Sequence, residues 1–245
     1  MVRLQIISDI HMENGTKLDE IIYPDPEGIL IVAGDVARVE NYNLYESTLK
    51  YLCSKFEKVI LVPGNHEYYC IGENIKTMDL IMTTLHTFAS QLGNLIVLDN
   101  DGHTVGDTII YGSTFWSYCP SHLFPQTPIY MGPMIRKRLM TSHDFNRLHF
   151  QALIQLENMI ELAEERKKKL IVVTHYAPTF NGTLHPKYAK SPNKQRYCSQ
   201  NDYLLSNKVI KNWIYGHTDF NGNTGKLLTN QVVSKGAIFP FTLEI

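Results

Sequence analysis

Short apolar runs recur along the first two thirds of the chain and each ends on glycine or on polar residues. These runs cover residues 4–7, 29–33, 59–62 and 170–174 and are rich in β-branched side chains. Runs of this length and composition are typical of strands that are buried on both faces. We therefore expect four buried strands at these positions.

Between the runs lie stretches in which apolar residues recur every three or four positions, the spacing of an amphipathic helix. One carries Leu44, Leu49, Leu52 and Phe56, one runs from 78 to 92 and closes at Gly93, and one runs from a cap at Asp144 to the cationic residues 166–169. A cationic end is favourable near the carbonyl end of a helix. Strands that alternate with helices indicate an α/β architecture with a mostly parallel sheet.

The pattern changes in the last third of the chain. Short strand candidates at 214–215, 226–228, 231–234 and 239–244 are separated by tight turns. This spacing predicts an antiparallel second sheet. The expected fold is a four-layer αββα sandwich, two mixed β-sheets flanked by helices, in a single domain over 1–245.

Two long segments have no clear periodicity, and we expect them to form walls of a substrate site. Residues 117–142 contain four prolines, and residues 178–201 form the second irregular stretch. Irregular segments of this length in a compact domain are commonly binding loops or lids.

Composition excludes several classes of protein. The 245 residues are 44% hydrophobic, and 23 Lys and Arg balance 24 Asp and Glu. This is the composition of a globular chain, without a basic field for long nucleic acid and without an apolar run long enough to cross a membrane. Four cysteines without CxxC spacing and a start without signal-peptide features predict a cytoplasmic protein.

Polar residues of similar chemistry follow five of the expected strands. They are Asp9 and His11, Asp35, Asn65 and His66, His175, and His217 and Asp219. Ligands bind outside the carboxyl ends of strands in α/β sheets, so these side chains are expected to converge. Carboxylate, amide and imidazole donors together suit Mn²⁺, Fe or Zn²⁺.

The ordered series resembles the calcineurin-like metallophosphoesterase superfamily, in particular its small prokaryotic-type members. The matching motifs are D-x-H at 9–11, GD at 34–35, PGNHEYY at 63–69, HYAP at 175–178 and a GHxH-like turn at 216–219. The motifs extend over nearly the whole chain and occur in the order of the family.

The resemblance implies a role for each matching residue. Asp9 and His11 would bind a first metal ion, Asp35 would bridge two ions, and Asn65, His175 and His217 would bind the second. His66 would be the catalytic residue, donating a proton to the leaving oxygen or stabilising charge at phosphorus. The cofactors implied are two divalent ions, Mn²⁺ first and Fe, Zn²⁺, Mg²⁺ or Ni²⁺ as alternatives, which would supply metal-bound hydroxide.

One position departs from the family pattern, because Asp219 stands where GHxH has its second histidine. A carboxylate can bind the same ions and favours harder ones such as Mn²⁺ or Mg²⁺. We expect Asp219 to be a ligand of the first metal; the alternative is a weakened first site. A third carboxylate would also lower the positive charge that attracts an anionic substrate.

Other residues are candidates for substrate binding or for orienting ligands. The substrate-binding candidates are Arg38, Tyr176, Lys187, Lys190 and Arg196, three of them in a basic run that could equally be a solvated loop. Glu67, next to His66, is expected to orient a metal-binding imidazole.

The sequence therefore predicts an enzyme that hydrolyses a phosphomonoester or phosphodiester. The expected substrate is a small molecule or a peptide, with long nucleic acid and membranes disfavoured by the balanced charge and modest hydropathy. The alternatives are a non-catalytic scaffold that keeps the fold and a metal-dependent nuclease. No pattern in the chain indicates an oligomeric state.

Overall fold

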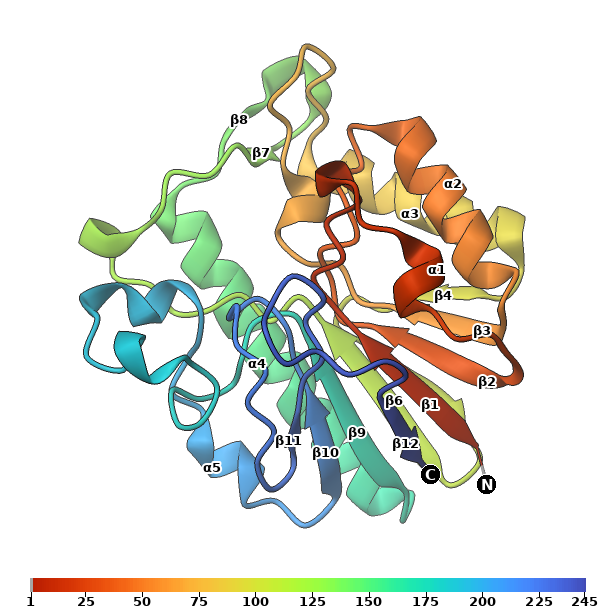
Figure 1. Ribbon diagram of the computed structural model, residues 1–245. Helices are drawn as coiled ribbons and strands as arrows, with labels where there is room; N and C mark the ends of the chain where they lie inside the picture. Colours follow the sequence, from red (N-terminus) through yellow and green to blue (C-terminus); the bar gives the residue numbers. More distant parts are fainter. Residues whose placement is uncertain (1) are drawn as a thin grey trace.

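Two five-stranded sheets form the centre of the computed structural model, which describes residues 2–245 (Figure 1). The first sheet has the order β12-β1-β2-β3-β4, with β12 Thr242–Glu244, β1 Arg3–Ile7, β2 Asp25–Val32, β3 Phe56–Leu61 and β4 Leu95–Val97. The second has the order β11-β10-β9-β6-β5, with β11 Leu227–Leu228, β10 Ile210–Ile214, β9 Lys169–Thr174, β6 Thr108–Ser113 and β5 Asp101–Val105. A small third sheet pairs β7 Tyr130–Met131 with β8 Arg138–Leu139.

Both large sheets are mixed. Strands β1 to β4 are parallel and β12 is antiparallel to β1, while β6, β9, β10 and β11 are parallel and β5 is antiparallel to β6. The four apolar runs are confirmed as strands β1, β2, β3 and β9.

The antiparallel second sheet expected from the last third of the chain is wrong. Strand β10 pairs in parallel with β9 and β11, and β12 leaves that region to join the first sheet beside β1. Residues 231–234 form no strand, although Gln231 makes an isolated bridge with Ser8. The alternation of apolar and polar residues identified extended segments, but it does not indicate which distant strand each segment pairs with.

Helices cover the outer faces of both sheets. Their bounds are α1 Leu18–Ile21, α2 Tyr42–Cys53, α3 Met78–Leu92, α4 Ser142–Glu165 and α5 Asp202–Leu205. Helices α2 and α3 pack on β3 and β4 of the first sheet, and α4 packs on β6 and β9 of the second (Figure 1). The order of layers is therefore αββα, as expected. Helix α2 ends at Cys53, so Phe56, which the periodicity assigned to a helix, begins β3.

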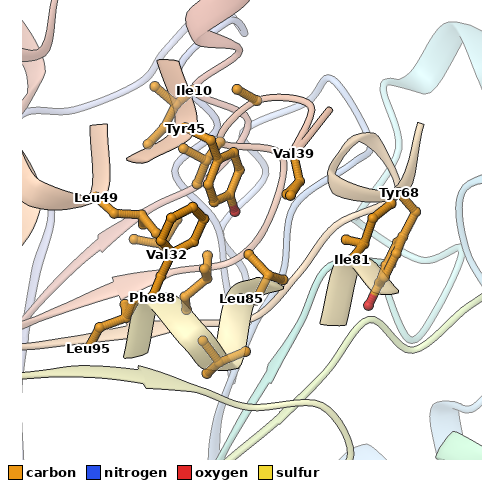
Figure 2. Packing of buried hydrophobic residues seen from close by; sticks show 14 of the residues in the cluster. Ile10, Val32, Val39, Tyr45, Leu49, Tyr68, Ile81, Leu85, Phe88 and Leu95 are labelled. Carbon is orange, nitrogen blue, oxygen red and sulfur yellow. The ribbon is translucent and has the colours of Figure 1, made fainter. Parts of the chain in front are cut away.

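The apolar runs are continuous because successive residues of each strand enter different core layers. In β2, Leu30 and Val32 face the helices, whereas Ile29 and Ile31 face the second sheet. Figure 2 shows the outer layer, in which Tyr45 and Leu49 of α2 and Leu85 and Phe88 of α3 pack around Val32 and Leu95. Burial of one such side chain contributes about 1.5–3 kcal/mol, so these layers hold the strand ends in fixed positions.

The two irregular segments contain only short elements. Residues 117–142 include the 3-10 turns Ser121–Leu123 and Met134–Arg136 and the β7-β8 pair, and residues 178–201 include the turns Pro186–Tyr188 and Pro192–Arg196. An isolated β-bridge between Ala177 and Cys198 joins the second segment to the loop that follows β9. Within residues 2–245, no helix is both long and apolar enough to cross a membrane.

Candidate metal centre

The loops that follow β1, β2, β3, β9 and β10 meet at one edge of the two sheets, because all five strands end there (Figure 1). Direct hydrogen bonds join these loops. The amide of Asp9 donates to the carbonyl of Gly34 at 3.0 Å, and the amide of Gly216 donates to the carbonyl of His175 at 3.0 Å. The amide of His217 donates to both carboxylate oxygens of Asp9 at 3.1 Å. The chain therefore brings residues 9 and 217 into direct contact.

Five of the predicted metal ligands have left-handed backbone conformations: Asp219, whose φ is 52°, and four residues whose side chains belong to the ligand groups described below. The φ angles are 51° at Asp9, 47° at His11, 57° at Asp35 and 69° at His217. Residues other than glycine adopt this region at a cost, and they keep it only where the surroundings enforce it. The buried strands and the hydrogen bonds between loops enforce it here, and the four side chains turn toward a common space.

Two glycines permit the loops to approach one another closely. A Cβ atom on Gly34, whose φ is 89°, would collide with the ring of His175 and with the backbone of Gly64. A Cβ atom on Gly64 would collide with the Asp35 carboxylate. The glycines of the GD and GNHE motifs are thus required by packing around Asp35 and His175.

His175 is fully buried and its two ring nitrogens have different partners. Nδ1 lies 2.9 Å from the carbonyl oxygen of Ala33, so this nitrogen carries a proton and donates it. Nε2 faces the Oδ1 atom of Asn65 at 2.9 Å and the Oδ2 atom of Asp35 at 3.3 Å. The Nδ2 atom of Asn65 donates to the hydroxyl of Tyr69 at 2.9 Å, which directs Oδ1 toward His175.

The oxygens of Asn65 and Asp35 are both acceptors, so the Nε2 atom that faces them must carry a proton or bind a cation. Burial opposes charging of the His175 ring, but the Asp35 carboxylate and the nearby Asp9 outweigh burial and raise the pKa of His175 to about 9. A proton on Nε2 satisfies the two acceptors at neutral pH. A divalent cation can take the place of that proton, bound by Nε2 and by the same two oxygens, so the donor set fits a metal ion.

His217 completes this group. Asp35, His175 and His217 offer ligand atoms that all lie within 4.8 Å of one another. Nε2 of His217 lies 3.3 Å from the carbonyl oxygen of Arg196, which leaves Nδ1 for the metal side. Burial and the neighbouring His175 lower the pKa of His217 to about 3, so this ring is neutral, the form that binds metal.

Asp9, His11 and Asp35 form a second group that meets the same distance limit. Burial, which exceeds the other influences, raises the pKa of Asp9 to about 6, although the hydroxyl of Ser8 donates to its Oδ2 atom at 2.6 Å. Nε2 of His11 lies 3.7 Å from Oδ2 of Asp35. Asp35 belongs to both groups, which is the arrangement expected of a bridging carboxylate.

His66 lies at the open side of the two groups. Its side chain is 31% exposed, whereas the side chain of Asp35 is 2% exposed. Its backbone amide donates to Oδ1 of Asp35 at 2.8 Å, and its ring lies between those of His11 and Tyr69, with centroid distances of 4.6 and 4.5 Å. The ring therefore borders the metal groups and can be reached from solvent.

Asp219 lies apart from these residues. It is exposed, has a φ of 52°, and contributes to none of the three groups of possible ligands found among residues 2–245. Its role as a ligand therefore stays a prediction.

The candidate substrate-binding residues occupy different surroundings. Tyr176 is buried and its ring lies 4.1 Å from that of His217. Arg196 donates from Nε to the carbonyl oxygen of Leu123 at 2.6 Å. Lys187 and Lys190 are exposed, and the ammonium of Lys187 lies 4.7 Å from the ring centre of Tyr188. Two of these candidates contact His217, a predicted ligand: Tyr176 through its ring and Arg196 through its backbone carbonyl.

Arg38 is half-buried beside Glu40, with Nε 3.3 Å from Oε1 of that residue. Glu40 also accepts hydrogen bonds from the amides of Ile71 and Gly72. Arg38 is thus engaged with a carboxylate on the loop after β2, and its role toward substrate stays a prediction.

Glu67 has a different partner from the one expected. Its carboxylate accepts hydrogen bonds from the backbone amides of Gly64, Asp35 and Val36, at 2.7, 3.0 and 2.7 Å, and from the hydroxyl of Tyr45 at 3.2 Å. The expectation that Glu67 orients an imidazole is therefore wrong. Backbone amides at a tight turn attract a carboxylate, and Glu67 is held between the loops after β2 and β3.

The sequence interpretation missed Glu13. His11, Glu13 and His66 form the third group of possible ligands, and Oε1 of Glu13 lies 3.3 Å from Nδ1 of His11. The available signal was an acidic residue two positions after the histidine of D-x-H, followed by Asn14 and Gly15, which favour a tight turn.

Comparisons with known proteins agree with this geometry. A sequence model of the calcineurin-like phosphoesterase family matches residues 2–219. An uncharacterized protein of Acanthamoeba polyphaga mimivirus is 26% identical over 260 residues, which cover 94% of this chain and 88% of the viral protein. A shorter match, 46% identical over 69 residues, links 27% of this chain to 21% of the [acyl-carrier-protein] phosphodiesterase PptH of Mycobacterium tuberculosis.

Solved structures share the fold. The crystal structure of phosphopantetheinyl hydrolase PptH from Mycobacterium tuberculosis superposes with a TM-score of 0.65 at 18% identity, covering 94% of this chain and 89% of that one. A dimetal phosphatase from Danio rerio gives a TM-score of 0.50 at 11% identity, covering 95% and 87%. Because the family match extends over most of the chain, the protein belongs to the calcineurin-like phosphoesterase family.

Proposed function

We propose that this protein is a dinuclear metal-dependent phosphoesterase in which His66 acts on the leaving group. The observation that carries the proposal is the pair of ligand groups that share Asp35, with a partly exposed imidazole beside them. Family membership supports phosphoester hydrolysis as the reaction.

The proposed ligands divide between two ions. Asp9 and His11 bind the first ion, and Asn65, His175 and His217 bind the second, with Asp35 shared. Asp219 is proposed to reach the first ion from the exposed edge of the site. Bound divalent ions supply Lewis acidity and lower the pKa of a coordinated water.

The residues of the chain then bind substrate and move one proton. A phosphoryl group enters beside the ring of His66, which is flanked by the rings of His11 and Tyr69. The oxygen of a water molecule forms a bond to phosphorus, and the bond from phosphorus to the ester oxygen breaks. His66 gives a proton to the departing oxygen, and the proton lost by the water goes to solvent. Arg38, Tyr176, Lys187, Lys190 and Arg196 are proposed to contribute to substrate binding.

The relative named for phosphodiester hydrolysis on acyl carrier protein suggests the first substrates to test. Metal-stripped protein is reconstituted with Mn²⁺, Mg²⁺, Zn²⁺ or Ni²⁺ and assayed on 4-nitrophenyl phosphate, bis(4-nitrophenyl) phosphate and phosphopantetheinylated acyl carrier protein. We expect metal-dependent turnover that falls by 10²–10⁴-fold in His66→Ala. His86→Ala is the matched control, because His86 is an exposed histidine on α3. Binding of two ions without turnover of any substrate would favour the scaffold alternative.

A further inference from the structure

Glu13 is placed next to the site by a short turn that directly follows His11. The turn Met12–Asn14 begins after the left-handed residue His11 and ends at Gly15, whose φ is 81°. The amide of Asn14 donates to the carbonyl of His11 at 2.8 Å and closes the turn. The Glu13 side chain consequently folds back over the ring of His11 and is only 15% exposed.

One oxygen of Glu13 faces two histidines that have different proposed roles. Oε1 lies 3.3 Å from Nδ1 of His11 and 3.5 Å from Nδ1 of His66. The two rings are nearly perpendicular, at 81°, so both Nδ1 atoms can point at the same oxygen. Nδ1 of His66 is buried and has no hydrogen-bond partner among residues 2–245, so its polar contact with Glu13 is the ion-pair separation of 3.5 Å.

We propose that Glu13 is a positioning residue that orients the metal-binding His11 and the catalytic His66 with a single carboxylate. This inference rests on the proposed function. A carboxylate that accepts from Nδ1–H fixes the tautomer and the rotation of an imidazole, and leaves Nε2 directed away from the carboxylate. At His11 this directs Nε2 toward Asp35, where the first ion is proposed to bind. At His66 it directs Nε2 away from Glu13, toward the side open to substrate.

The same three residues could instead hold an additional ion, since their ligand atoms lie within 4.8 Å of one another. That arrangement would require His11 to bind metal through both ring nitrogens, because Nε2 already faces the Asp9 and Asp35 group. The separations of 3.3 and 3.5 Å between nitrogen and oxygen are those of a hydrogen bond and an ion pair. Positioning is therefore the simpler role.

The test compares Glu13→Ala and Glu13→Gln with Glu20→Ala, because Glu20 is an exposed carboxylate on α1 that pairs with Lys17. Calorimetry with Mn²⁺ measures the affinity and the number of sites. We expect two sites in the unchanged protein and a 10–100-fold weaker first site in Glu13→Ala, since loss of a carboxylate that orients a metal-binding histidine has effects of this size. Glu13→Gln keeps an acceptor oxygen and should restore part of the affinity.

Kinetics on aryl phosphodiesters with good and poor leaving groups measure the effect on His66. Loss of a positioned proton donor matters most when the leaving oxygen is basic. We expect kcat of Glu13→Ala to fall about 10-fold for a 4-nitrophenyl ester and about 100-fold or more for a phenyl ester at saturating Mn²⁺, with KM little changed. An equal loss for both esters would overturn the role at His66.

Long-range ¹H–¹⁵N NMR of the metal-free and Zn²⁺-loaded protein reports the His66 tautomer without any turnover. We expect Nδ1–H in the unchanged protein and a shift toward Nε2–H in Glu13→Ala. If no substrate is hydrolysed, the proposed function fails, while calorimetry and NMR still decide the role of Glu13. The inference would be overturned if Glu13→Ala kept both the Mn²⁺ affinity of the first site and the His66 tautomer. It would also be overturned if the unchanged protein bound three Mn²⁺ ions and Glu13→Ala bound two.

Discussion

Oε2 of Glu67 accepts a hydrogen bond from the backbone amide of Asp35 at 3.0 Å. This contact joins the loop after β2, which carries Asp35, to the loop after β3, which carries Asn65. The same oxygen accepts the amide of Gly64 at 2.7 Å, and Oε1 accepts the amide of Val36. Three buried amides thus depend on one side chain that has no exposed surface.

Substitution Glu67→Gln should destabilise the protein and weaken the metal centre. The side-chain amide of glutamine has an NH₂ donor in place of one acceptor oxygen. At least one of the backbone amides would then face this donor and lose its hydrogen bond. We expect a loss of about 2–4 kcal/mol in the free energy of unfolding, measured by urea titration. Glu161→Gln on the exposed face of α4 is the matched control. A change within 0.5 kcal/mol, about that of a neutral surface substitution, would contradict this role.

Tyr69 should control the second metal ion through the amide of Asn65. In Tyr69→Phe, Nδ2 of Asn65 loses its acceptor at 2.9 Å, and the amide is free to rotate its oxygen away from His175. We expect the affinity for Mn²⁺ at one of two sites to fall about 10–100-fold. Tyr203→Phe removes a hydroxyl that donates to Glu157 at the surface and should leave the isotherm unchanged. Equal Mn²⁺-binding isotherms for Tyr69→Phe and Tyr203→Phe would show that other contacts hold the side-chain amide of Asn65 in place.

Asp219 should contribute less to metal binding than the buried ligands. Its side chain is exposed and lies outside the ligand groups, so binding the first ion requires a rotation toward the site. We expect Asp219→Ala to weaken the first site by about 10-fold or less, whereas His11→Ala removes that site in the same titration. Asp219→His should raise the relative affinity for Zn²⁺ over Mn²⁺, because imidazole is the softer ligand. A loss of the first site in Asp219→Ala would show that this carboxylate is a full ligand.

Strands β1, β2, β3 and β9 and the convergence of the loops that follow them could be predicted because burial and chain direction are local signals. Strands β1, β2, β3 and β9 have both faces buried, and parallel strands end at one edge, so residues that follow them converge. Strand β5 was missed because it is half-exposed and polar, and β12 was assigned to the wrong sheet because its partner lies more than 200 residues away. The contact between Glu13 and His66 joins two loops, and no spacing within either loop indicates it.

Asp144 should stabilise the start of α4 in a manner that depends on pH. Its carboxylate accepts from both terminal nitrogens of Arg138 at 2.6 and 2.9 Å and from the amide and hydroxyl of Thr141, which completes a capping box. The hydrogen bonds from Arg138 contribute most to holding the pKa of Asp144 below its usual range. A carboxyl group with a lowered pKa in the folded state stabilises that state above the unfolded pKa of about 3.9 and loses the contribution as pH falls further.

Substitution Asp144→Asn should therefore cost about 1–3 kcal/mol at pH 7, measured by urea titration. The difference from the unchanged protein should stay constant between pH 6 and 8, which lies about two units or more above the unfolded pKa, and should shrink below about pH 4. Asp79→Asn, in the first turn of α3 and exposed, provides the matched control and should show a smaller difference at pH 7. A difference that persists unchanged to about pH 2 would mean that the carboxylate acts through its shape and not through its charge.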